Sequence, residues 1–166
     1  MFSNLAAITT TPAGLRCLAP LCQESTVRGN ETKSTQLWIS HRIESTAKEL
    51  SLTYKVYEAS LSDFLASAWK NYDGFVFCLA SGAVVRLIAP LLSDKSTDPA
   101  VVVVDPLSKF AISLCGGHQS GGDRITKQIS QLLEAQPVLT GAANALDLPA
   151  IDTLGTPFGW RKGSGD

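Results

Sequence analysis

The chain has 166 residues, of which 45% are hydrophobic and 17% charged, so it fits one compact domain and is neither disordered nor collagen-like. Fourteen Lys and Arg against 15 Asp and Glu leave a formal net charge of -1, which supplies no basic excess for nucleic acid or anionic lipid. The longest uncharged apolar stretch, 74–85, is too short to span a bilayer. We therefore expect a cytoplasmic domain that binds neither nucleic acid nor a membrane.

The cysteine pattern favours a reducing compartment and no metal site. The four cysteines form no C-x-x-C pair, and two histidines cannot complete a zinc set by spacing. The uncharged start of the chain lacks a basic segment and is broken by Pro12 and Gly14, which argues against a signal peptide. Cys78 and Cys115 lie in apolar runs, where we expect them to act as small buried hydrophobes rather than catalytic thiols.

The first half of the chain alternates predicted strands and helices. The run Leu5–Thr9 predicts a buried strand, and Thr10-Thr11-Pro12 then opens a helix with a capping hydroxyl and a proline in its first turn. A polar loop is expected over 23–34. The remaining elements expected here are a strand at Gln36–Ile39, a helical stripe at Ile43, Ala47 and Leu50, a β-prone run over 53–57 and an amphipathic helix at Leu61–Trp69.

The second half predicts a hairpin between two helices. After a turn at 71–74 and a strand at Phe75–Leu79, Ser81-Gly82 opens a helix that Pro90 should kink or shorten. The runs Val101–Val104 and Phe110–Leu114 are joined by five residues, too few for a parallel crossover, so they should pair as antiparallel strands. A helical stripe over 125–133, a last strand over 136–140 and a glycine-rich linker over 155–166 complete the pattern.

This alternation indicates an α/β fold of three layers, with a mostly parallel sheet flanked by helices and one antiparallel hairpin, over residues 1–154. In such folds the ligand crevice lies where strand ends meet helix starts. Two loops follow apolar strands and open helices: Ala80–Ala83, with Arg86 one turn later, and Gly116–Asp123. The second is no P-loop, since Asp123-Arg124 stand where Lys and Ser or Thr are needed, and no Rossmann or nucleophile-elbow motif occurs.

Each candidate residue in these loops has a structural alternative. His118 lies among four glycines, where a ligand can approach, but a lone histidine is often packed or capping. Asp123 is placed to cap the helix that begins there. Arg86 and Lys95 are as readily explained as solvated surface charges.

The residues from Gly74 to Asp123 resemble a known family. The matching pieces are Gly82-Ala83-Val84-Val85-Arg86, Ala89-Pro90-Leu91-Leu92, Lys95, Asp98-Pro99-Ala100-Val101, Val104-Asp105 and Gly117-His118. In order and spacing they resemble the cobalamin biosynthesis protein CbiG family, the cobalt-precorrin 5A hydrolases. Looser matches at both ends extend the resemblance over roughly residues 1–160.

Two segments depart from that family. Where it commonly reads G-H-x-G-G-A-N, this chain has Gly117-His118-Gln119-Ser120-Gly121-Gly122-Asp123, and where it reads T-T-A-T-D this chain has Thr140-Gly141-Ala142-Ala143-Asn144. The family's separate C-terminal domain is not among these 166 residues. Some members are fused to a precorrin-3B C17-methyltransferase, so a piece of such a fusion, or a module with an associated methyltransferase, is expected.

The resemblance implies hydrolysis of the δ-lactone on ring A of cobalt-precorrin 5A, with loss of acetaldehyde. It implies a base, His118 with Asp123 as its competitor, and N–H donors from Gly116, Gly117, Gly121 or Gly122. The substrate's carboxylates would be bound by Ser81, Gly82, Arg86, Lys95 and Arg124 beside two helix N-termini. Cobalt arrives with this tetrapyrrole substrate, so no further cofactor or protein metal site is expected. The alternatives are a non-catalytic corrinoid-binding module and an anion-binding domain unrelated to corrinoids.

Overall fold

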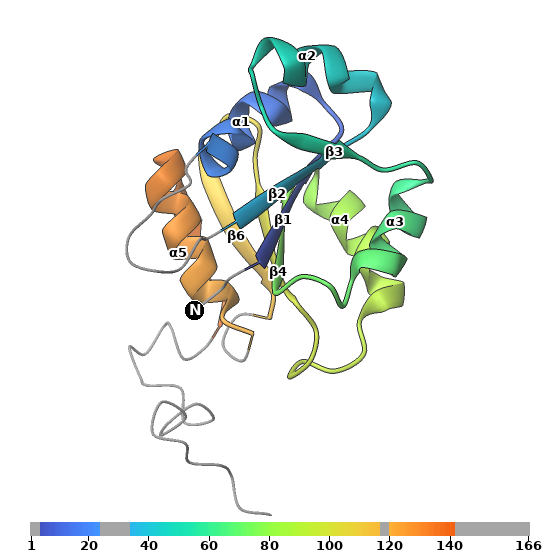
Figure 1. Cartoon of the computed structure of the whole chain (residues 1–166). Helices are drawn as coiled ribbons and strands as arrows, with labels where there is room; N and C mark the ends of the chain where they lie inside the picture. Colours follow the sequence, from blue (N-terminus) through green and yellow to red (C-terminus); the bar gives the residue numbers. More distant parts are fainter. Residues whose placement is uncertain (1–3, 24–33, 117–119, 142–166) are drawn as a thin grey trace, which may run out of the picture.

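The computed structural model describes residues 4–23, 34–116 and 120–141, which form one seven-stranded sheet with helices on both faces (Figure 1). The strands lie in the order β3-β2-β1-β4-β5-β6-β7. Their bounds are β1 (Asn4–Thr9), β2 (Ser34–Ile39), β3 (Tyr54–Val56), β4 (Gly74–Cys78), β5 (Ala100–Val104), β6 (Phe110–Cys115) and β7 (Gln136–Val138). The helices are α1 (Pro12–Gln23), α2 (Glu44–Glu49), α3 (Leu61–Ala68), α4 (Ser81–Ile88) and α5 (Gly122–Leu133), with 3-10 turns η1 (His41–Ile43) and η2 (Ala89–Leu91).

Alternation of side chains along the buried strands divides the core into two layers. On one face Val76, Val102 and their neighbours pack under α1, α2 and α5. On the other face Phe75 and Phe77 pack with Leu65 of α3 and Val84 of α4. Because both faces are covered, β4 and β5 are buried along their whole length, which explains their continuous apolar sequences. The predicted three-layer α/β fold is confirmed.

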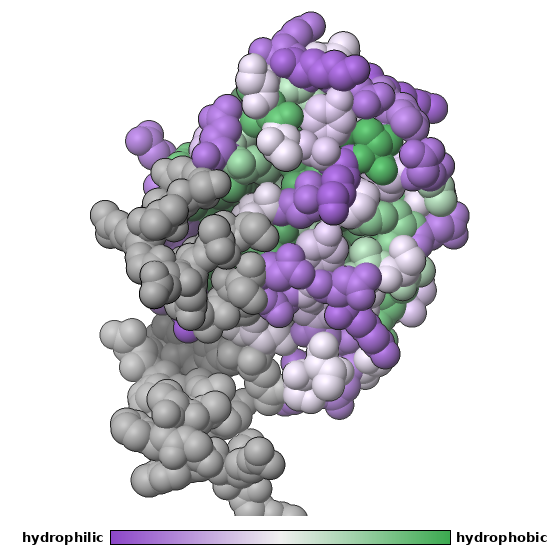
Figure 2. Space-filling model, in the orientation of Figure 1, coloured by the Kyte–Doolittle hydropathy of each residue, from purple (hydrophilic) through white to green (hydrophobic). Residues whose placement is uncertain are grey.

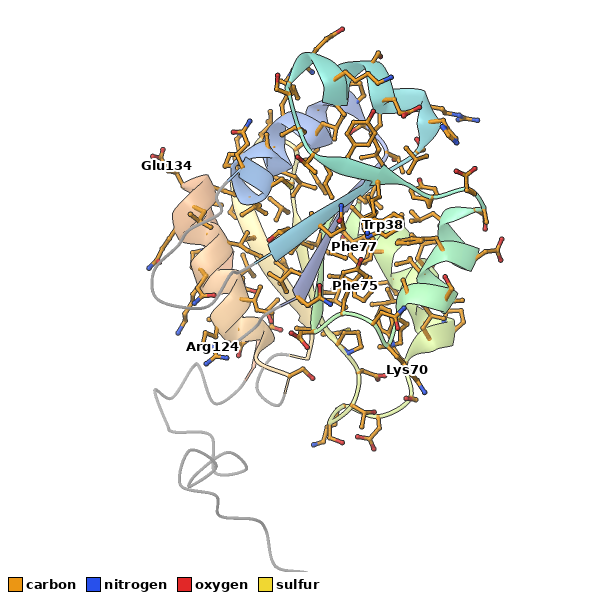
Figure 3. All side chains as sticks on the ribbon, viewed as in Figure 1. Trp38, Lys70, Phe75, Phe77, Arg124 and Glu134 are labelled. Atoms are coloured by element: carbon orange, nitrogen blue, oxygen red, sulfur yellow. The ribbon has the colours of Figure 1, made fainter. Side chains whose placement is uncertain are left out.

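The aromatic side chains gather in the second layer. Phe75 stacks between Trp69 and Phe77, and Trp38 packs on Phe64 of α3 with ring centroids 4.5 Å apart. Figure 3 shows Trp38, Phe75 and Phe77 between the sheet and α3. On the surface, hydrophobic residues are exposed beside α3, whereas hydrophilic residues cover α2 (Figure 2). This layer fixes α3 and α4 against the sheet.

Strand direction decides where each loop lies. Strands β1 to β5 are parallel, so all five end at one edge of the sheet, here called the carboxyl edge. Strand β6 runs antiparallel to β5, with Val101 opposite Cys115, and β7 is parallel to β6. The end of β6 therefore lies where β5 begins, at the opposite edge, here called the amino edge. Connections after β4 and after β6 leave the sheet at different edges.

Most predicted elements are present, with some changes in their ends. Pro90 stops α4 at Ile88, and η2 follows it, as the sequence predicts. The last strand is shorter than predicted, because β7 ends at Val138. Of the loop predicted over 23–34, Gln23 belongs to α1 and Ser34 to β2, and the rest lies outside the described residues, as does the predicted linker over 155–166. Within the described ranges, no helix is long and apolar enough to cross a membrane.

Candidate functional site

The β4–α4 loop lies at the carboxyl edge and carries the two predicted binding residues Ser81 and Gly82. Helix α4 begins at Ser81, and its N-cap, Ala80, offers no side-chain hydrogen bond. Ser81 and Gly82 are exposed, and a Cβ built on Gly82 meets nothing within 4 Å. The start of α4 is therefore open, and its first backbone N–H groups and the exposed Ser81 hydroxyl are accessible to a ligand.

The start of α1, at the same edge, is packed closely. The buried Thr9 hydroxyl donates to the carbonyl of Cys78 at 3.1 Å, which ties β1 to β4. Thr11 caps α1, because its hydroxyl accepts the N–H of Gly14 at 3.1 Å, and this confirms the predicted capping hydroxyl. A Cβ on Gly14 would lie 2.0 Å from the Thr9 hydroxyl, so only glycine fits. This close contact fixes α1 on the sheet.

The glycine loop, Gly116–Asp123, lies at the amino edge. Gly116 and Gly121 have φ of 72° and 70°, the left-handed region that glycine adopts without strain. A Cβ on Gly116 would lie 3.0 Å from the Ala100 Cα, and one on Gly122 would lie 3.0 Å from the carbonyls of Cys115 and Gly116. The described part of this loop is thus pressed against the start of β5. His118 and Gly117 lie outside the described residues.

Ser120, one of the departures from the resembled family, anchors this loop. Its hydroxyl donates to the carbonyl of Asp98 at 2.7 Å, and the carbonyl of Lys95 lies 3.4 Å from it. The N–H of Gly122 donates to the carbonyl of Gly116 at 2.8 Å. The N–H of Gly122, one of the predicted oxyanion donors, is therefore already used inside the loop.

Helix α5 begins in the glycine loop with a different cap from the one predicted. Its N-cap is Gly121, which makes no side-chain hydrogen bond, and Asp123 lies one residue inside the helix. The prediction that Asp123 caps α5 is therefore wrong. As an acid in the first turn, Asp123 still interacts favourably with the positive end of the helix dipole.

The structure does not bring the two predicted loops together. Ser81 and Gly82 lie at the carboxyl edge and the glycine loop at the amino edge, since β6 runs against β5. The expectation of a single crevice between them is wrong. Arg86 is exposed in the last turn of α4, about 7 Å along the axis from Ser81 at 1.5 Å per residue. It therefore lies away from the helix N-terminus that it was expected to reinforce.

Two predicted cations do lie at the amino edge. Lys95 is exposed in the segment before β5, and its own carbonyl is next to the Ser120 hydroxyl. Arg124 is exposed in the first turn of α5, and Figure 3 shows it at the opposite end of that helix from Glu134. The glycine loop, the start of α5, Lys95 and Arg124 thus form one candidate site for an anionic ligand.

Acidic groups near this site are used to shape the backbone. The Asp98 carboxylate accepts the N–H of Ser93 at 2.9 Å, and Asp94 accepts the N–H of Ser96 at 2.7 Å. The Ser96 hydroxyl and N–H lower the pKa of Asp94, so its charge is retained in the turn. Burial raises the pKa of Cys115, with the nearby Asp98 adding to the effect, so this thiol stays neutral beside the glycine loop.

Metal-binding side chains are scattered over the part of the chain that the structure describes. Within the three described ranges, no group of three or more His, Cys, Asp or Glu side chains could hold a metal ion. The four cysteines are free thiols, two of them buried and two half-buried. Cys78 is buried as predicted, whereas Cys115 is half-buried at the end of β6.

The sequence analysis did not predict that Ser120 anchors the glycine loop, or that Asp94 and Asp98 shape the backbone before β5. The available signal was the five-residue connection over 105–109, because an antiparallel β6 must end beside the start of β5. That inference alone places the glycine loop next to 93–99. The partners of the Ser120 hydroxyl are two backbone carbonyls, which no residue pattern identifies.

Comparisons with known proteins point to one family. Residues 63–144 match the family model of the cobalamin synthesis G N-terminal domain. A protein of Priestia megaterium named cobalt-precorrin-5A hydrolase is 39% identical over 106 residues, which are 64% of this chain and 28% of that protein. A protein of the same name in Salmonella typhimurium is 37% identical over 98 residues, or 59% of this chain and 28% of that protein. The chain thus matches less than a third of the length of these relatives.

A solved structure confirms the fold. The crystal structure of a cobalamin biosynthesis protein G homolog from Sulfolobus solfataricus superposes with a TM-score of 0.52 and 21% sequence identity. The match covers 93% of this chain and 44% of that one. The segment matched by the family model runs from α3 to just beyond β7 and includes the whole glycine loop, Lys95 and Arg124. Residues 63–144 of this chain are therefore similar in sequence to the cobalamin synthesis G N-terminal family.

Proposed function

We propose that this chain is part of a cobalt-precorrin-5A hydrolase of cobalamin biosynthesis, which opens the δ-lactone of that corrinoid and releases acetaldehyde. The observation that carries the proposal is the 37–39% identity to two relatives of that name. The matched family segment includes the amino-edge site, where glycine backbone, a helix N-terminus and two cations meet. The substrate carries many carboxylates, for which such a site is suited.

The chemistry assigns the chain three tasks. His118 takes a proton from the attacking water, because a neutral imidazole can act as a base at physiological pH. Backbone N–H groups of Gly116, Gly117 or Gly121 stabilise the oxyanion that develops on the lactone carbonyl. Lys95 and Arg124 hold peripheral carboxylates of the substrate. Asp123, in the first turn of α5, is the competing base.

The reaction balances with one water. Hydroxide adds to the lactone carbonyl and the ring C–O bond breaks, which leaves a carboxylate on the ring and an alkoxide on the bridging carbon. The alkoxide collapses to acetaldehyde, the electrons of its bond to the macrocycle pass to the macrocycle, and the proton returns there. Cobalt remains bound in the substrate throughout and belongs to it rather than to the protein.

A second candidate is a non-catalytic corrinoid-binding module that serves a fused or associated domain, such as a precorrin methyltransferase. It is favoured by one observation: the matches cover 28% of each of the two hydrolases. A site completed by another domain would bind substrate here but exclude water and align the lactone only when both are present.

The deciding experiment is incubation of this chain with cobalt-precorrin 5A in the absence of oxygen. Hydrolysis predicts acetaldehyde in equal amount to a product whose mass reflects gain of water and loss of acetaldehyde. His118→Ala is the matched catalytic control. Binding of the corrinoid with no acetaldehyde would favour the binding module, and absence of binding would refute both functions.

A further inference from the structure

We propose that Ser120 is a positioning residue, whose hydroxyl ties the glycine loop to the segment before β5 and so keeps the N–H groups of the loop in place for lactone hydrolysis. The inference rests on the proposed function, because it names the side chain that holds the oxyanion donors. The hydrogen bond from the Ser120 hydroxyl to the carbonyl of Asp98 is here called the Ser120 tie.

The Ser120 tie joins two segments that are distant in the sequence. Ser120 lies in the glycine loop after β6, and Asp98 lies in the connection before β5, 22 positions earlier in the chain. The donor oxygen is 2.7 Å from the acceptor oxygen, which is the usual length of a hydroxyl hydrogen bond. Ser120 is half-buried, so water competes less for this bond than for one on the open surface.

The acceptor end of the tie belongs to a fixed segment. The N–H of Asp98 donates to the carbonyl of Asp94 at 2.8 Å, and its carboxylate accepts the N–H of Ser93 at 2.9 Å. Two residues later, Ala100 is wholly buried in β5, and its N–H donates to the carbonyl of Asp73 at 3.1 Å. A side chain bound to Asp98 is therefore bound, through this segment, to the sheet.

Further contacts hold the described part of the glycine loop beside the tie. A Cβ on Gly116 would lie 3.0 Å from the Ala100 Cα and 3.0 Å from the Ser120 Cβ, so the backbone of Gly116 is packed between them. The N–H of Gly122 closes the loop by donating to the carbonyl of Gly116 at 2.8 Å. Because Ser120 contacts Gly116 and precedes Gly122 by two residues, loss of its hydroxyl should loosen both.

A loosened loop should affect catalysis more than binding. Stabilisation of an oxyanion requires donors within hydrogen-bond distance of one position, and a displacement of about 1 Å can lower a rate by about 100-fold. The carbonyl of Lys95 also lies 3.4 Å from the Ser120 hydroxyl. The ammonium of Lys95, however, stands at the end of a flexible four-carbon chain and can still reach a carboxylate after a small shift of its backbone.

The tie depends on a side chain particular to this sequence. The resembled family commonly has glycine where this chain has Ser120, and glycine carries no hydroxyl. The tie thus adds to the backbone contacts of Gly116 and Gly122 and does not replace them. We therefore expect its loss to lower the rate in part and not to abolish it.

The test compares Ser120→Ala with Ser120→Thr, which keeps a hydroxyl, in the reaction with cobalt-precorrin 5A without oxygen. Ser120→Ala should lower kcat for acetaldehyde release about tenfold and change KM less than about twofold, and Ser120→Thr should recover most of the rate. Ser67→Ala is the matched control. It removes an exposed hydroxyl of α3 that also donates to a carbonyl at 2.8 Å, that of Phe64, and it should leave kcat unchanged.

Amide hydrogen exchange followed by NMR provides a readout that does not depend on the reaction. The Gly122 N–H should exchange about tenfold faster in Ser120→Ala than in the wild type, and at close to the wild-type rate in Ser120→Thr. The Ala100 N–H, bonded to Asp73 within the sheet, should exchange at the same rate in all three proteins. This pattern would show that the loop has loosened while the sheet has not.

Two results would overturn the proposal: a kcat in Ser120→Ala equal to that of the wild type, and faster exchange of Gly122 and Ala100 alike, which would make Ser120 a residue of general stability. If the wild type releases no acetaldehyde, the proposed function fails, and exchange alone decides the tie. Faster exchange at Gly122 in Ser120→Ala, restored in Ser120→Thr, would then support a positioning role in a binding module, and unchanged exchange would refute it.

Discussion

The two edges of the sheet carry loops with one local pattern, a buried strand, a glycine turn and a helix, but the two loops are built differently. At the carboxyl edge Gly82 has open space around it. At the amino edge Gly116 and Gly121 have left-handed conformations, and Gly116 packs against Ala100. A loop held by close contacts keeps its N–H groups in place, which is what stabilisation of an oxyanion requires. The amino edge is therefore the better candidate for catalysis.

The largest effect that tests this comparison concerns His118. General-base assistance is worth about 10²- to 10⁴-fold, so His118→Ala should lower the rate of lactone hydrolysis by that factor while corrinoid binding changes little. The other histidine, His41, follows β2 at the carboxyl edge, and His41→Gln should leave the rate unchanged. The measurement is acetaldehyde release at saturating substrate.

The pH profile separates the two candidate bases. A histidine base predicts a rate that falls as pH drops through about 6 to 7, whereas the carboxylate of Asp123 predicts a fall nearer 4. If His118→Ala lowers affinity and leaves the saturated rate intact, His118 is a ligand contact and Asp123 becomes the better base.

A second prediction compares two glycines at helix starts of the carboxyl edge. Gly14→Ala places a methyl group where the Thr9 hydroxyl already lies, 2.0 Å away, and Thr9 cannot move without losing its bond to Cys78. We expect a loss of about 2–3 kcal/mol in the free energy of unfolding. Gly82→Ala meets nothing and should stabilise by about 0.4–1 kcal/mol.

Urea unfolding of both variants is the measurement. An equal change in the two would show that the close contact between α1 and β1 is not what holds α1 in place.

A third prediction concerns the cations. Lys95→Ala should weaken corrinoid binding by about 1 kcal/mol, because a charged hydrogen bond to carboxylate is worth more than this but an exposed pair is screened. Arg86, in the last turn of α4 and away from the glycine loop, should matter less.

Titration of the corrinoid against Lys95→Ala and Arg86→Ala measures which substitution weakens binding more. The reverse order, with Arg86→Ala weakening binding by about 1.5–3 kcal/mol and Lys95→Ala having no effect, would move the substrate's carboxylates to the α4 side.

The helices and strands could be predicted because each is marked by residues within its own segment or next to it. Pro90 stops α4, the apolar runs of β4 and β5 mark strands buried on both faces, and the short connection over 105–109 predicts the antiparallel pair. The fold class follows from these alone. The reversal of β6 is by itself sufficient to separate the glycine loop from Ser81.

Other features depend on contacts between distant residues. The Cys17 sulfur lies 3.2 Å from the Ser108 hydroxyl, 91 positions along the chain, and no spacing rule pairs these two residues. The fit of Gly14 against Thr9 likewise depends on helix-to-strand packing. Such contacts are set by tertiary packing, which a residue pattern does not encode.

The smallest expected effect concerns the titration of His41, which follows β2 at the carboxyl edge. His41 lies 3.2 Å from a Glu44 oxygen and 3.6 Å from one of Glu58, and these carboxylates raise its pKa, Glu44 most. Because the folded pKa exceeds the unfolded value of about 6.5, the pair's contribution to stability is complete below that pH and is lost as pH rises through the folded pKa. All three side chains are partly or largely exposed, so the contribution is small. An NMR titration should therefore show His41 titrating at higher pH than a model peptide, and Glu44→Gln should lower the pKa of His41. If Glu44→Gln leaves that pKa unchanged, the Glu44 carboxylate is not what raises it.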